Sequence, residues 1–162
     1  VSLNEIAHNV AIGTVRYELI KPDLGKIITF DINTSLKIEG DTCSYIQYSC
    51  VRAARILEKF GKEPNFDTNF DQLNTEYEIG LSKQIGLFEV FVNDAAKNYS
   101  PKVIAKYCYD LAVMFSSFYE HVNVLKADTP ELINARMCLV LSFKITLEKA
   151  LDLIGIVAPQ RM

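Results

Sequence analysis

Two tyrosines and three basic residues share one side of a predicted helix within "DTCSYIQYSCVRAARILEKFGK", residues 41–62. At roughly 100° per residue, they fall on an arc of about 80°. The arc holds Tyr45, Tyr48, Arg52, Arg55 and Lys59. Aromatic rings stack on unpaired bases for about 1–3 kcal/mol each, and basic side chains bind phosphates. This arc is therefore suited to contacts with a single-stranded loop of RNA.

The same residue types also occur where helices pack and where proteins bind one another. Spacing alone favours packing or a protein interface over RNA. A separate arc of the helix is apolar, and we expect it to face the core. It holds Cys43, Ile46, Cys50, Ala53, Leu57 and Phe60.

Helical signals extend along the whole chain and predict an all-α fold, a helical bundle. Ser2 with Glu5, Ser100 with Pro101, and Thr129 with Pro130 resemble helix starts. Long helices are expected over 2–21, 42–60, 75–98, 101–122 and 130–154, and the third of them is expected to be interrupted near Gly86. A short helix is expected within 32–38 and a polar loop over 63–72. No alternating strand pattern is visible.

The chain has 162 residues, 49% of them hydrophobic and 23% charged, which indicates one globular domain. Its net charge of −3 is unevenly spread. Residues 1–62 hold eight basic and seven acidic side chains, residues 63–131 hold five and eleven, and residues 132–162 hold four and two. A surface for nucleic acid would therefore use the two ends of the chain and avoid its acidic middle.

The sequence contains no recognisable catalytic motif, metal-binding motif or membrane-spanning segment. His8 and His121 stand apart from any catalytic pattern, and His8 is expected to be a structural residue beside the core. The four cysteines include no Cys-x-x-Cys pair, which favours reduced thiols in a cytoplasmic protein over a metal site or disulfides. No run approaches the roughly 18 apolar residues of a membrane span. No phosphate-binding loop is present, so we expect no cofactor in this chain.

Four segments resemble the C-terminal region of arginyl-tRNA synthetases. They are "IEGDTCSYIQYSCVRAARIL" at 38–57, "AIGTVRYELI" at 11–20, "AKYCYDLAVMFSSFYEHVNVL" at 105–125 and "ALDLIGIVAPQRM" at 150–162. The third resembles the Asp-Leu-Ala helix of the DALR anticodon-binding domain. Gln160 and Ser44 depart from the family's usual glutamate and proline, and residues 63–86 match least.

The resemblance implies part of an arginine–tRNA ligase, a class I enzyme that uses ATP to charge tRNA with arginine. The catalytic signatures of that class are not in this sequence, so the chain alone is not identified as an enzyme, and ATP would bind in the parent's catalytic domain. Residues 1–41 would be connecting helices that follow the catalytic domain, and residues 42–162 the DALR-type domain, packed as one helical unit. The opening on Val1, without an initiator methionine, also led us to expect a piece of a longer protein.

The resemblance further implies that Tyr45, Tyr48, Arg52 and the terminal Met162 meet the anticodon loop of tRNA(Arg). Arg55 and Lys59 are added from the helical wheel alone and are expected on phosphates. Two alternatives stay open at this point. One is the related domain of another class I enzyme, such as a cysteinyl-tRNA synthetase, and the other is a helical protein–protein module that uses the acidic residues 63–131. The sequence does not predict the oligomeric state.

Overall fold

The computed structural model describes residues 2–159 and contains helices without strands over that range, which confirms the all-α prediction. The elements are α1 (Leu3–Ile20), α2 (Ile32–Ser35), α3 (Cys43–Phe60), the 3-10 helix η1 (Phe70–Gln72), α4 (Glu76–Gly86), α5 (Phe88–Lys97), α6 (Pro101–His121) and α7 (Pro130–Leu153). The predicted interruption near Gly86 is the break at Leu87 between α4 and α5.

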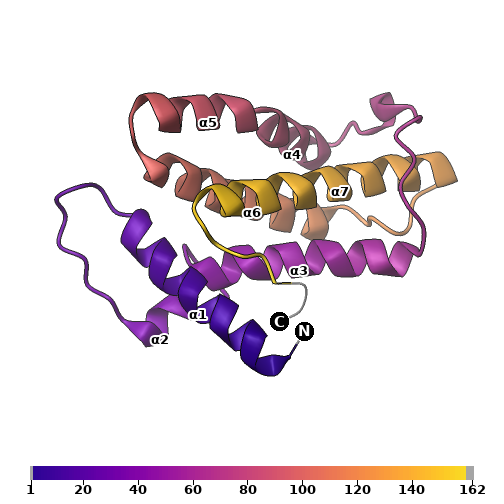
Figure 1. Ribbon diagram of the computed structural model, residues 1–162. Coiled ribbons are helices and arrows are strands. Elements are labelled where there is room, and N and C mark those ends of the chain that lie inside the picture. The colour runs from indigo at the N-terminus through magenta and orange to yellow at the C-terminus, as the bar shows by residue number, and fades with distance from the viewer. Residues whose placement is uncertain (1, 160–162) are drawn as a thin grey trace.

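Three long helices, α3, α6 and α7, lie side by side at the centre of the fold (Figure 1). Helices α4 and α5 cover one side of this group, and α1 crosses α3 on the other side. Helix α7 runs back against α6, while α3 and α6 run in the same direction (Figure 1). The carboxyl-terminal ends of α3 and α6 therefore lie at the same end of the bundle.

Side-chain caps explain where most of these helices begin. Ser2, Thr42 and Thr129 each accept a hydrogen bond from the backbone N–H three residues on, which satisfies a donor that the first turn leaves free. Thr75 forms a full capping box with Glu78. Ser100 precedes Pro101 as predicted, but its side chain makes no capping bond.

Aromatic side chains and small thiols fill the core between the central helices. The rings of Phe115 and Phe143 stack with their centroids 3.9 Å apart and join α6 to α7. All four cysteines are buried and unpaired. Burial raises the pKa of the Cys43 thiol to about 12, so it packs as a small neutral group. No helix within residues 2–159 is long and apolar enough to span a membrane.

Helix α3 is buried on more sides than its apolar arc predicts. Four residues of that arc are fully buried, but Leu57 and Phe60 at its end are only half-buried. Helices α1, α6 and α7 all pack against α3, so polar side chains are enclosed as well. Gln47 has no exposed surface, and its Nε2 donates to the Val157 carbonyl at 2.9 Å. The segment after α7 is thereby held against α3.

A left-handed glycine turns the chain after α7. Gly155 has φ +69°, a conformation that side-chain-bearing residues rarely adopt. Its carbonyl accepts a hydrogen bond from Arg16, and a Cβ placed on Gly155 would overlap the Arg16 guanidinium. This turn brings residues 156–159 back toward α1 and α3 (Figure 1).

Candidate nucleic-acid interface

The guanidinium of Arg52 contacts two tyrosine rings from different helices. Its central carbon is 4.9 Å from the ring centroid of Tyr48 on α3 and 5.0 Å from that of Tyr119 on α6. Both contacts are in the range of a cation–π interaction. Because it contacts rings on both helices, Arg52 presents a half-buried positive charge at the junction of α3 and α6.

Tyr45 sits one turn before Tyr48 and is also half-buried. Its hydroxyl donates to Ser116 Oγ on α6 at 3.0 Å, and its ring lies 6.0 Å from the ring of Tyr109. The predicted arc is thus not a freely exposed stripe, because α6 covers part of it. Tyr45 helps to join α3 to α6, and only part of its ring is available for a ligand.

A pocket of about 540 Å³ opens beside this group, between the ends of α3 and α6. Its lining comes from α3, from the end of α6 and from the loop that follows: Arg52, Arg55, Ile56, Lys59, Tyr119, Glu120, His121, Val122, Asn123, Val124 and Leu125. Arg55 and Lys59 are exposed at its rim. Three basic side chains face one carboxylate, Glu120, so the pocket favours an anionic ligand.

A second aromatic stack borders the pocket at the end of α6. The rings of His121 and Tyr77 lie almost parallel, with centroids 4.2 Å apart. His121 is also fixed through Nδ1, which lies 2.8 Å from the Ser117 carbonyl oxygen. Because Tyr77 belongs to α4, the aromatic surface extends over three helices and combines stacking faces with cations.

The structure therefore brings five of the six sequence-predicted site residues onto one surface. These are Tyr45, Tyr48, Arg52, Arg55 and Lys59, all on α3. Met162 lies outside the described residues. The bond between Gln47 and the Val157 carbonyl holds the segment after α7 on α3.

Sequence reasoning missed the part of the surface that α6 contributes. Tyr119 is not among the predicted site residues, yet its side chain is 44% exposed and lines the pocket. The loop residues 122–125 carried no signal at all. The one sequence feature that could have indicated this part of the site is the pair of rings, Tyr119 and His121, near a helix end. Only the packing of α3 and α6 in the same direction places Tyr119 beside Arg52.

Other chemistry is sparse in the described part of the chain. Residues 2–159 hold no group of three or more His, Cys, Asp or Glu side chains arranged to bind a metal ion. His8, expected beside the core, is exposed on α1. The strongest pKa shifts belong to buried groups such as Tyr107, whose hydroxyl donates to the Gln84 carbonyl and whose pKa is raised chiefly by burial. These are core contacts, so the α3–α6 surface is the candidate site.

Comparisons with curated proteins point to one kind of enzyme. An arginine–tRNA ligase from Methanothrix thermoacetophila is 39% identical over 158 residues, and one from Lactobacillus johnsonii is 35% identical. Each match covers 98% of this chain but 28% of the relative. The chain thus spans little more than a quarter of these proteins. The matches favour the arginyl over the cysteinyl resemblance.

Solved structures agree with the sequence comparison. The arginyl-tRNA synthetase of Thermus thermophilus superposes with a TM-score of 0.92 and 36% identity over the whole chain, which corresponds to 28% of that protein. The synthetase of Plasmodium falciparum shares the fold, with a TM-score of 0.83 and 24% identity. The DALR anticodon binding domain family matches residues 46–162. The chain therefore belongs to the DALR anticodon-binding domain family, in the form found in arginyl-tRNA synthetases.

Proposed function

We propose that this chain is the tRNA-binding part of an arginine–tRNA ligase and holds the anticodon loop of tRNA(Arg) on the surface formed by α3 and α6. The parent enzyme would then join arginine to that tRNA with ATP. The chain itself would bind no cofactor, because ATP would be used in the catalytic part of the parent. The buried, unpaired thiols support a reducing compartment, and we place the enzyme in the cytoplasm.

The observation that carries this proposal is the contact of the Arg52 guanidinium with both Tyr48 and Tyr119 at the edge of a basic pocket. Single-stranded RNA loops are recognised by stacking splayed bases on aromatic rings and arginine planes, while cations meet the phosphates. Here the two kinds of group lie on one surface. Arg55 and Lys59 would meet phosphates at its rim.

The terminal Met162 is proposed as a fourth contact with the loop, as the family resemblance implies. The structure supports this through the preceding residues, since Val157 is fixed on α3 by Gln47. A methionine side chain is flexible and polarisable and can pack on a base. Removing Met162 alone should weaken tRNA binding and leave the fold unchanged.

Residues 1–41 are proposed to connect the domain of residues 42–162 to the catalytic part of the parent chain. The segment between α1 and α3 exposes an unusual number of apolar side chains: Leu24, Ile27, Ile28, Phe30, Ile32, Leu36 and Ile38, of which Leu24 and Ile27 are each 95% exposed. An apolar surface of this kind normally marks an interface. Outside the region that matches this chain, each relative has more than twice as many further residues, and a part of them could cover this apolar surface.

An electrophoretic shift with tRNA(Arg) tests the proposal. The unaltered chain should shift the tRNA, and both Tyr48→Ala and Arg52→Ala should weaken binding by about 5- to 100-fold, as expected for the loss of one stacked base or one charged contact. Circular dichroism should show unchanged helix content in both variants.

Tyr99→Ala is the matched control, because Tyr99 is 90% exposed and lies before α6, at the other end of the bundle from the pocket. It should bind tRNA like the unaltered chain. No shift with the unaltered chain would favour a protein–protein module. Equal weakening by all three variants would contradict the assignment of the site to α3 and α6.

A further inference from the structure

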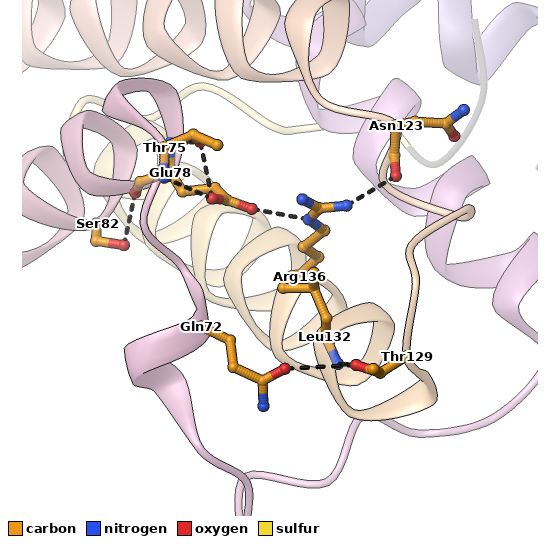
Figure 2. Close-up of polar contacts among 8 residues, drawn as sticks. All are labelled: Gln72, Thr75, Glu78, Ser82, Asn123, Thr129, Leu132 and Arg136. Carbon is orange, nitrogen blue, oxygen red and sulfur yellow. Dashed lines mark hydrogen bonds and ion pairs between the residues drawn. The ribbon is translucent and has the colours of Figure 1, made fainter.

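A buried ion pair joins α4 to α7 behind the pocket. The Glu78 side chain has no exposed surface, and its Oε1 accepts a hydrogen bond from Arg136 Nε at 2.7 Å (Figure 2). Its other oxygen accepts from the backbone N–H and the hydroxyl of Thr75, at 2.9 and 2.7 Å. Burying charges is costly unless they are paired and hydrogen-bonded, and here the carboxylate is fully bonded.

Besides the ion pair with Glu78, Arg136 makes a second contact, to a residue that lines the pocket. Its Nη1 donates to the backbone carbonyl of Asn123 at 3.1 Å, and Figure 2 shows that carbonyl directed toward the guanidinium while the Asn123 side chain points away. Asn123 lies between the buried side chains of Val122 and Val124. All three residues line the pocket beside Arg52.

Stability alone does not account for this arrangement. A buried ion pair is commonly no more stable than a pair of well-packed apolar residues of the same size. What an apolar pair cannot do is hold a backbone carbonyl. The planar fork of arginine can donate to Glu78 and to Asn123 at once, because its nitrogens point in fixed, different directions.

Arg136 is also badly placed to contact RNA directly. Its side chain is 12% exposed and is not part of the pocket lining. Any effect of Arg136 on a ligand must therefore pass through the loop that begins at Val122. Among the contacts described for residues 2–159, the bond from Arg136 to Asn123 is the only side-chain hydrogen bond between this loop and α7 before the cap at Thr129.

We propose that Arg136 is a positioning residue for the RNA site. Held by Glu78, it fixes the Asn123 carbonyl and with it the wall formed by residues 122–125, and so sets the affinity of the pocket without touching the RNA. The proposal rests on the function proposed above. It adds α4 and α7 to a site whose contacts come from α3 and α6.

The variant Arg136→Lys tests this directly. Lysine keeps a positive charge for Glu78, but its single ammonium does not reproduce the two-directional fork. Affinity for tRNA(Arg) should fall about 3- to 10-fold, which corresponds to the loss of one hydrogen bond. The slope of log affinity against log salt should stay unchanged, because no phosphate contact is lost. Amide exchange at residues 123–126 should become faster in the free protein.

Lys144→Met is the matched control, since it breaks another ion pair on α7, with Glu148, far along the helix from the loop. It should change neither tRNA affinity nor exchange in the loop. If Arg136→Lys does not fold, the double variant Glu78→Gln with Arg136→Met removes both charges together and keeps an oxygen for the Thr75 N–H. It should show the same loss of affinity.

The results separate the two proposals. If the unaltered chain binds tRNA and Arg136→Lys binds equally well, with unchanged loop exchange, the positioning role is wrong and the pair is only structural. A flatter salt dependence in the double variant, which removes the charge of Arg136, would also overturn it, because it would mean a direct phosphate contact. If the unaltered chain does not bind tRNA, the proposed function fails first and this inference falls with it.

Discussion

Arg52 on α3 and Tyr119 on α6 are 67 positions apart in sequence, yet the guanidinium carbon lies 5.0 Å from the tyrosine ring centroid. The same carbon lies 4.9 Å from the ring centroid of Tyr48, so two rings restrain the Arg52 side chain. A site that is already ordered loses less conformational entropy on binding than a site of free side chains. The stack therefore links the packing of two helices to the affinity of the surface.

Replacing Arg52 by lysine should weaken tRNA binding although the charge is kept. Lysine lacks the planar guanidinium that contacts the rings of Tyr48 and Tyr119. We expect a loss of about 3- to 10-fold by fluorescence titration, with the salt dependence unchanged. Lys97→Arg, which exchanges one exposed basic side chain for another at the end of α5 and away from the pocket, should leave tRNA affinity unaltered. Equal affinity of Arg52→Lys and the unaltered chain would show that only charge matters at this position.

Removing Arg55 and Lys59 together should flatten the salt dependence of binding. Each side chain is exposed at the pocket rim, and each phosphate contact with single-stranded RNA contributes about 0.7 to the slope of log affinity against log salt. The double alanine variant should therefore lower the slope by about 1.4. Lys97→Ala, an exposed lysine at the end of α5, serves as the control. An unaltered slope would mean that both residues are simply solvated.

Tyr17→Phe should destabilise the fold without touching the RNA site. The buried hydroxyl of Tyr17 donates to Asp41 Oδ1 at 2.6 Å and so ties α1 to the segment that leads into α3. Loss of a hydrogen bond to a charged group should lower the free energy of unfolding by about 1–3 kcal/mol, measured by urea denaturation. A change below about 0.3 kcal/mol would show that the bond contributes little to stability.

The buried carboxylate of Glu78 should make the free energy of unfolding depend on pH in the acidic range. Burial raises its pKa, but hydrogen bonds from Thr75 and Arg136 outweigh that effect, and the pKa lies below its ordinary value of 4.5. Because the folded-state pKa is lower than the unfolded one, this group stabilises the fold above about pH 4.5 and the contribution is lost as pH falls through the folded-state pKa. Urea unfolding between about pH 5 and pH 3 should show a steeper decline for the unaltered chain than for Glu78→Gln with Arg136→Met. Parallel declines would contradict the assignment.

Local signals in the sequence predicted the helices closely, because caps and breakers act within a few residues. Thr129 with Pro130 marked the start of α7, and the region near Gly86 marked the break before α5. Spacing on one helix likewise placed Tyr48 and Arg52 on the same surface. These features depend on chain geometry over one or two turns.

The remaining parts of the site depend on which helices meet. No spacing within α6 shows that Tyr119 lies against Arg52, since that requires α3 and α6 to pack in the same direction. The Glu78 and Arg136 pair is likewise formed by residues 58 positions apart and looks like two ordinary charges in sequence. Helix α3 is buried on more sides than its apolar arc predicts for the same reason, because α1, α6 and α7 all pack against it.

The most direct test of the account is a nuclear magnetic resonance titration of the chain with a hairpin that carries the anticodon stem and loop of tRNA(Arg). We predict that the largest chemical-shift changes fall on Tyr48, Arg52 and Tyr119 and on the loop 122–125, and that a hairpin with a scrambled loop produces much smaller changes. Largest changes on α4 and α5, or equal responses to the two hairpins, would contradict the claim that the α3–α6 surface holds the anticodon loop.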